Sequence, residues 1–283
     1  MKNLKNLLIL ARFDKPIGIF LLLWPTLAAL FMASEQIPQL NLLFIFIVGT
    51  ILMRAAGCVV NDLLDVNFDK HVERTKNRLL VTGEITKVSA LIFLVLLLLL
   101  SFILVLQLNI YAILLSVPAL FFALCYPLTK RFFRLPQLIL GIAFGFGILM
   151  SFAAVKNELN VNAWLLFLAN IFWALGYDSH YAIADLSDDK NIPIHSSVKT
   201  FQKFSPYLIL FSYLGMYLAL YSLAILNNFS MLSYFFLTLS LVIATKGLIG
   251  SRKLDPKINF KAFKNNNYVG FLFFLAFLVE NLA

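Results

Sequence analysis

The sequence predicts an all-α integral membrane protein, with nine transmembrane helices in a single domain over residues 1–283. Composition is the first reason: 61% of the residues are hydrophobic, 13% are charged, and the mean hydropathy is +0.88. An ordinary soluble domain has about 45–50% apolar and about 25% charged residues. A soluble chain of this length could not bury so much apolar side chain, so we expect a lipid bilayer around it.

Long apolar runs are the second reason, because a helix needs about 20 mostly apolar residues to cross a bilayer. In chain order these runs are 17–33, 42–60, 88–107, 110–126, 137–155, 161–177, 207–226, 230–250 and 268–282. The first run follows Lys2 and Lys5, as a signal peptide would. It is longer than a signal core of about 7–15 residues, and eight further runs follow it, so we expect it to be a retained helix.

The placement of basic residues is the third reason, and it also gives the orientation. When alternate loops are assigned to one side, that side receives all but two of the 23 Lys and Arg residues, the exceptions being Lys156 and Arg54. Loops rich in Lys and Arg are cytoplasmic. We therefore expect a cytoplasmic N-terminus, an external C-terminus and no nucleic-acid partner.

Acidic residues gather in two stretches, 61–69 and 178–189, which directly follow the second and sixth runs on the cytoplasmic side. If each run continues as a helix, each stretch stacks polar side chains four residues apart on one helix face. The stacked residues are Asn61, Asp65 and Asp69 in the first stretch and Tyr181, Asp185 and Asp189 in the second. Carboxylates stacked in this way repel one another unless a cation lies between them.

Oxygen ligands of this kind select Mg²⁺ or Ca²⁺ over softer metals. Mg²⁺ typically takes one or two carboxylates and completes its coordination with water and substrate phosphates. Two carboxylate-bearing helix ends that face each other would therefore hold a Mg²⁺-bound diphosphate. A solvated acidic loop end would explain a single aspartate, but two spaced clusters at the same membrane depth favour the metal site.

Basic residues near these clusters are candidates for binding anions. Arg54 lies seven positions before Asn61, on the same predicted helix face and within the bilayer. An arginine in a span usually faces a cavity or a partner. Lys130 and Arg131 lie in another loop on the same side. Either set could bind diphosphate oxygens or a substrate carboxylate, and the sequence does not divide these two tasks.

Together these motifs resemble the UbiA superfamily of intramembrane prenyltransferases. The resemblance rests on Asn61-Asp-x-x-Asp65-x-x-x-Asp69 with Asp185-x-x-x-Asp189, and it continues through 12–18, 53–62, 74–78, 135–137 and 265–270. It covers nearly the whole chain and is closest to the bacterial branch that prenylates 4-hydroxybenzoate. It implies nine helices around a central cavity that opens laterally to lipid, in the bacterial inner membrane, with the active site at the cytoplasmic face.

The resemblance also implies a reaction: Mg²⁺-dependent transfer of a polyprenyl group from polyprenyl diphosphate to the ring of 4-hydroxybenzoate, ortho to the phenol, in ubiquinone biosynthesis. Asp62 and Asp178 would support the residues that carry the Mg²⁺-diphosphate. Those residues would be Asn61, Asp65, Asp69, Asp185 and Asp189.

A mechanism follows as a hypothesis. Mg²⁺, helped by Lys130 and Arg131, stabilises the departing diphosphate, and the aromatic ring attacks the allylic carbon. Asp65 acts at the metal, Asp185 is the candidate for activating the phenol, and Tyr181 is the candidate for positioning it.

Arg54 and Arg12 are candidates for binding the benzoate carboxylate. Three alternatives stay open. A related reaction could use a naphthoate or a haem as acceptor. A secondary transporter would place its charges near the membrane midplane, whereas these acids cluster at one interface. A purely structural membrane protein is the third alternative, but it would not explain why two acidic clusters are present.

Overall fold

The computed structural model describes residues 2–70, 75–186 and 193–282, and the regular elements in these ranges are all helices. Long helices occupy all nine places at which the sequence predicts a span. They are α2 (Ile17–Ser34), α3 (Leu40–Asp69), α4 (Lys87–Val105), α5 (Ile110–Thr129), α6 (Pro136–Lys156), α7 (Val161–Ala184), α10 (Ser205–Leu226), α11 (Met231–Ser251) and α12 (Pro256–Glu280). Three short helices, α1 (Lys2–Leu10), α9 (Ser197–Phe201) and η1 (Gln202–Phe204), complete the described part.

Seven helical segments are long and apolar enough to cross a membrane, which confirms the all-α membrane class. They are α2, α3, α4, α5, α6, the segment 197–226 and α11. The remaining long helices, α7 and α12, are not among these seven. The count of nine spans therefore stays a prediction.

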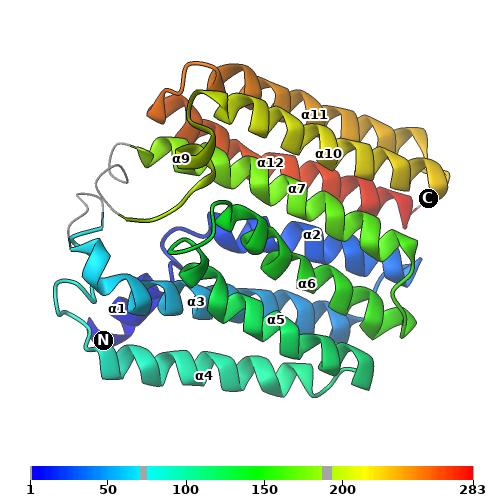
Figure 1. Cartoon of the computed structure of the whole chain (residues 1–283). Coiled ribbons are helices and arrows are strands. Elements are labelled where there is room, and N and C mark those ends of the chain that lie inside the picture. Colours follow the sequence, from blue (N-terminus) through cyan, green and yellow to red (C-terminus); the bar gives the residue numbers. More distant parts are fainter. Residues whose placement is uncertain (1, 71–74, 187–192, 283) are drawn as a thin grey trace.

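The long helices run side by side along one direction (Figure 1). α1, α9 and the N-terminus lie at one end of the bundle, and the C-terminus lies at the other. The first end, which we call the motif end, also contains the C-terminal turns of α3, α5 and α7 and the described parts of the loops that the sequence assigns to the cytoplasm.

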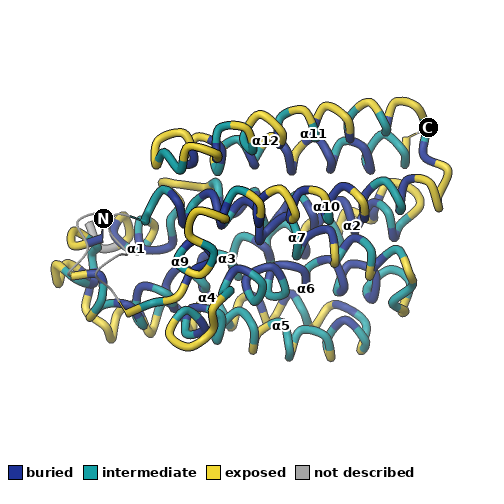
Figure 2. The backbone as a smooth tube through the Cα atoms, turned by 45° about the horizontal axis from the view of Figure 1, so that its top comes forward, coloured by how far each residue is buried: buried dark blue, intermediate teal, exposed yellow. Residues whose placement is uncertain are grey.

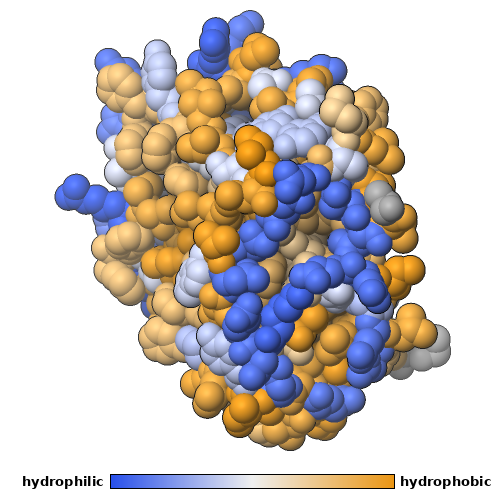
Figure 3. Space-filling view, turned by 90° about the vertical axis from the view of Figure 1, so that its right-hand side faces the viewer, coloured by the Kyte–Doolittle hydropathy of each residue, from blue (hydrophilic) through white to orange (hydrophobic). Residues whose placement is uncertain are grey.

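The opposite end faces the viewer in Figure 3. Hydrophilic residues gather across part of this end, and hydrophobic residues border them. An ion pair at this end joins α6 to the residue that follows α2: Lys156 Nζ lies 2.5 Å from Glu35 Oε1. This is the end at which the sequence places Lys156 alone among the basic loop residues.

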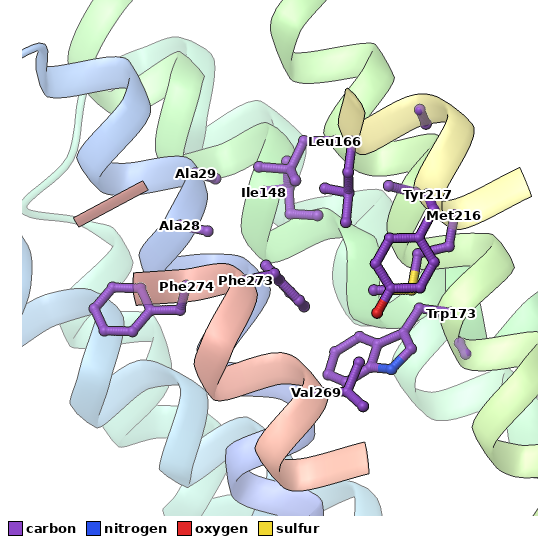
Figure 4. Packing of buried hydrophobic residues seen from close by; sticks show 14 of the residues in the cluster. Ala28, Ala29, Ile148, Leu166, Trp173, Met216, Tyr217, Val269, Phe273 and Phe274 are labelled. Atoms are coloured by element: carbon purple, nitrogen blue, oxygen red, sulfur yellow. The ribbon is translucent and has the colours of Figure 1, made fainter. Parts of the chain in front are cut away.

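The main core lies where α2, α6, α7, α10 and α12 meet. Trp173, Val269 and Phe273 pack together there, with Ile148 of α6 nearby (Figure 4). Glycines bring α6 close to its neighbours: a Cβ on Gly141 would lie 2.9 Å from a backbone Cα of α7. Exposed segments lie on the outer side of the bundle (Figure 2), and α4, α5 and α11 bury the smallest shares of their lengths.

α12 begins at Pro256, twelve residues before the predicted start of the last span at residue 268. Asp255 caps this helix by accepting a hydrogen bond from the Ile258 amide at 2.9 Å. The first half of α12 is polar, so the apolar run that predicts this span does not include it. Two of its asparagines, Asn259 and Asn266, are nevertheless buried, and Asn266 accepts a hydrogen bond from Trp173 Nε1 at 2.9 Å.

α7 continues past the predicted span to Ala184, with Asp185 as its C-cap residue. The Asp185 amide donates to the Tyr181 carbonyl at 3.1 Å, so these two residues keep the predicted four-residue helical spacing. Asp189 lies outside the described residues.

Candidate functional site

Three buried carboxylates line the C-terminal turns of α3. Asp62, Asp65 and Asp69 are only 2%, 2% and 6% exposed. α3 extends to Asp69, so the four-residue spacing of the first acidic stretch is helical, as predicted. A solvated acidic loop end, the plain alternative for this stretch, does not fit such burial, because buried carboxylates need partners to offset the loss of water.

Arginines from two other segments neutralise two of these carboxylates. Arg12, just after α1, places Nη2 at 2.9 Å from both oxygens of Asp62. Arg78 places Nη1 at 3.0 Å from Asp62 Oδ1 and at 2.5 Å from Asp69 Oδ2. The two arginines therefore tie the N-terminal segment and the loop after α3 to the same helix face.

The third carboxylate faces α5. Lys130, the C-cap residue of α5, forms an ion pair with Asp65 through Nζ and Oδ2. Arg131 donates from Nη2 to the Leu64 carbonyl at 2.8 Å, and its guanidinium lies 5.2 Å from the centre of the Phe68 ring. Asp65 Oδ1 is buried and has no hydrogen-bond partner. This oxygen is therefore available to a ligand.

The donors at this face fit Mg²⁺. Within residues 2–70, 75–186 and 193–282 no three His, Cys, Asp or Glu side chains lie close enough together to hold a metal by themselves. Mg²⁺ does not require such a group, because it typically uses one or two carboxylates together with water and substrate phosphates. A buried carboxylate oxygen without a partner, on Asp65, is a suitable ligand of this kind.

The second acidic stretch reaches the same end from α7. Asp178 receives a hydrogen bond from the Gln137 side chain and interacts electrostatically with Asp185 and Arg54. Tyr126, in the last turns of α5, interacts electrostatically with both Asp65 and Asp178. Residues of the two stretches therefore converge around the end of α5.

Tyr181 lies against α12. Its ring centre is 4.8 Å from that of Phe263 and 6.3 Å from that of Phe260. The ring is thus held in an aromatic cluster at the motif end.

Arg54 faces a cavity, as the sequence predicts. The cavity has a volume of about 190 Å³, is lined by residues of α2 to α6 and runs along α3 from Ile45 to Gly57, on the order of 18 Å at the helical rise. Arg54 is the one charged residue among the described residues that line it. Its Nε is buried without a hydrogen-bond partner.

The guanidinium of Arg54 lies in a narrow space between α2 and α6. It lies 5.9 Å from the centre of the Phe144 ring. A Cβ on Gly18 would lie 2.4 Å from Arg54 Nε, so only glycine leaves room for the guanidinium at this point of α2. The guanidinium interacts electrostatically with Tyr126, which also lines the cavity. Arg54 therefore joins the polar motif end to a mostly apolar chamber.

Some residues of this site were not singled out from the sequence. Arg78 and Tyr126 are the main examples, and both contact or interact with predicted residues only through the packing of different segments. Arg78 does lie in stretch 74–78, which carries part of the family resemblance, so this was the available signal.

Comparisons with known proteins agree on one family. The model of the UbiA prenyltransferase family matches residues 22–278. The 4-hydroxybenzoate octaprenyltransferase of Methylobacillus flagellatus is 48% identical over 273 residues, which cover 96% of this chain and 92% of that protein. The octaprenyltransferase of the same name from Photobacterium profundum is 46% identical, with coverages of 96% and 94%.

Solved structures show the same fold. A UbiA homolog from Aeropyrum pernix K1 superposes with a TM-score of 0.81 at 22% identity, covering 93% of this chain and 97% of that one. A UbiA homolog from Archaeoglobus fulgidus bound to GPP and Mg²⁺ superposes with a TM-score of 0.73 at 14% identity, with coverages of 98% and 100%.

Proposed function

Since the chain belongs to the UbiA prenyltransferase family, we propose that it transfers a polyprenyl group from polyprenyl diphosphate to the ring of 4-hydroxybenzoate, ortho to the phenol, in ubiquinone biosynthesis. One observation carries the proposal: buried Asp65, with an oxygen that has no hydrogen-bond partner and with basic side chains beside it, lies close to Tyr126. Tyr126 lines an apolar cavity in which Arg54 is the one charged residue among the described lining residues. The 46–48% identity to 4-hydroxybenzoate octaprenyltransferases over most of both chains supports the substrates.

The diphosphate binds at the motif end. Bound Mg²⁺ supplies positive charge that stabilises the departing diphosphate. Lys130 and Arg131 add to this charge, since both already lie at Asp65. Preorganised positive groups at a developing negative charge are usually the largest catalytic contribution. The residues that hold the Mg²⁺-diphosphate are Asn61, Asp65, Asp69, Asp185 and, outside the described residues, Asp189.

The acceptor binds beside Arg54. Of the two predicted candidates for the benzoate carboxylate, Arg12 already uses its Nη2 on Asp62, whereas the Nε of Arg54 has no partner. Arg54 therefore receives the carboxylate, and the phenol end points toward the motif end. There Asp185 accepts the phenol proton and Tyr181 orients the ring, with Asp178 holding Arg54 electrostatically.

The prenyl tail occupies the apolar length of the cavity. Its walls exclude water, which would otherwise capture the allylic cation. Phe102 of α4 and Leu120 of α5 line this cavity and are also 54% and 38% exposed. We propose that the tail reaches lipid between these helices. The basic residues at the motif end support the assignment of that end to the cytoplasmic face of the inner membrane.

A matrix of acceptors and prenyl donors tests the proposal. Purified protein in lipid is offered 4-hydroxybenzoate, a naphthoate or haem with each donor, with Mg²⁺ or with a chelator. Prenylated 4-hydroxybenzoate should form only with Mg²⁺, and Asp65→Asn and Asp185→Asn should each abolish it in a folded protein. Glu35→Gln, at the opposite end and with a 73% exposed side chain, is the matched control. Turnover of another acceptor alone, or full activity of both aspartate variants, contradicts the proposal.

A further inference from the structure

Asp62 differs from Asp65 because both of its oxygens accept hydrogen bonds from arginine. Oδ1 accepts from Arg12 at 2.9 Å and lies 3.0 Å from Arg78 Nη1, and Oδ2 accepts from Arg12 at 2.9 Å. Asp65, by contrast, keeps a buried oxygen without a hydrogen-bond partner. Two guanidinium groups therefore already occupy Oδ1 and one of them also occupies Oδ2, so a metal at Asp62 would have to compete with both arginines.

Arg12 reaches Asp62 from an unusual backbone conformation. Its φ is 61°, in the left-handed region that non-glycine residues rarely adopt. The residues before it, Leu10 and Ala11, are buried in one cluster with Ala55 and Val59 of α3. Such backbone persists only where the surrounding contacts determine it. The chain that follows α1 is therefore held to α3 both by these apolar contacts and by the ion pair next to them.

Arg78 connects Asp62 to a second segment. It binds Asp69 as well as Asp62, and these two acids lie seven residues apart on one face of α3. Leu80 and Ile85, which follow Arg78, are buried in the same cluster as Leu10. One carboxylate thus lies at the junction of the N-terminal segment, α3 and the loop 75–86.

We infer that Asp62 is a positioning residue and not a metal ligand. Arg12, Asp62 and Arg78, which we call the Asp62 clamp, fix the loop 75–86 on α3 and hold Asp69 in place next to Asp65. Removal of one partner from a buried ion pair leaves an uncompensated charge, so the loop and Asp69 shift when the clamp opens. The inference rests on the proposed function, since it concerns the face that binds Mg²⁺-diphosphate.

The affinity of the lipid-embedded protein for Mn²⁺, measured by electron paramagnetic resonance, tests the clamp. Mn²⁺ replaces Mg²⁺ here because it takes the same oxygen ligands. Arg12→Met and Asp62→Asn should each weaken Mn²⁺ binding, by about 10–100-fold, as is typical when a group that orients a metal-binding carboxylate is removed. The double variant should be no weaker than the weaker single variant, because both changes break the same contact.

The direction in which Arg12→Met changes the Mn²⁺ affinity shows whether Asp62 is a positioning residue or a metal ligand. If Asp62 were a ligand, Arg12 would compete with the metal, and its removal would tighten Mn²⁺ binding. The inference is overturned if Arg12→Met binds Mn²⁺ more tightly than the wild type or equally well. It is also overturned if the losses of Mn²⁺ affinity in the two single variants multiply in the double variant. Arg12→Met leaves Asp62 paired with Arg78. This variant therefore tests the role of Asp62 even if the Asp62→Asn protein fails to fold.

Two variants calibrate the measurement. Lys130→Met removes a cation that does compete for Asp65, and it should tighten Mn²⁺ binding in the absence of diphosphate. Lys156→Met breaks an ion pair at the opposite end and should leave the affinity unchanged. Unfolding temperatures of the same proteins give an independent readout. A wild-type protein that binds no Mn²⁺ refutes the proposed function, and a lack of coupling between Arg12 and Asp62 in unfolding temperature then refutes the clamp separately.

Discussion

Replacement of Arg54 by methionine should weaken binding of the acceptor and leave binding of the prenyl donor intact. Arg54 is the one charged residue among the described residues that line the cavity, so no neighbour can replace its charge. Loss of one member of a buried charged pair costs about 2–5 kcal/mol. Arg54 is only half-buried, so we take the lower end, about 2 kcal/mol, which corresponds to about a 30-fold rise in the KM for 4-hydroxybenzoate.

Gly18→Ala offers a second perturbation of the same contact. Its Cβ would lie 2.4 Å from Arg54 Nε, so the guanidinium must move while its charge is retained. We expect a rise in acceptor KM in the same direction but smaller than for Arg54→Met.

Initial rates over a range of acceptor concentrations, at saturating prenyl diphosphate and Mg²⁺, give these values. Phenol, which lacks the carboxylate, provides the chemical control: the wild type should prefer 4-hydroxybenzoate strongly, and Arg54→Met should lose that preference. An Arg54→Met enzyme that keeps the wild-type KM and the wild-type preference refutes the assignment of the carboxylate to Arg54.

The remaining predictions concern catalysis and packing. Lys130→Met should lower kcat by about 10²–10³-fold, the usual effect of removing one group that stabilises a developing charge, and single-turnover rates at saturating substrates measure it; an unchanged rate would remove Lys130 from the diphosphate site. Gly141→Ala should destabilise the protein by about 1–3 kcal/mol through overpacking against α7, whereas Gly57→Ala, where nothing lies within 4 Å of the new Cβ, should not; thermal unfolding in detergent compares the two. Asn266→Leu should cost about 1–3 kcal/mol, because it leaves buried indole and phenol groups of α7 and α10 without their partner; equal unfolding temperatures would contradict this.

The sequence was sufficient for features that depend on local periodicity. The four-residue spacing of Asn61, Asp65 and Asp69 predicts a shared helix face, and α3 extends far enough to provide it. An arginine inside an apolar run predicts a cavity, because its charge must avoid lipid, and Arg54 lines one.

Features that depend on contacts between distant segments could not be predicted in this way. Arg12 and Asp62 are 50 residues apart in the chain, and Lys130 and Asp65 are 65 apart. Which cation meets which carboxylate is decided by the packing of α1, α3 and α5, and the spacing of the motif contains no information on it. The beginning of α12 was missed for a related reason. Asn266 binds polar groups of α7 and α10 inside the bundle, so one side of a polar helical stretch is buried although the stretch lacks an apolar pattern.

Formation of prenylated 4-hydroxybenzoate by purified protein, followed by mass spectrometry with Mg²⁺ or with a chelator, tests the central claim most directly. The account predicts product from the wild type only when Mg²⁺ is present, and none from Asp65→Asn at any Mg²⁺ concentration. Product formed in the chelator, or formed at the wild-type rate by Asp65→Asn, would contradict it.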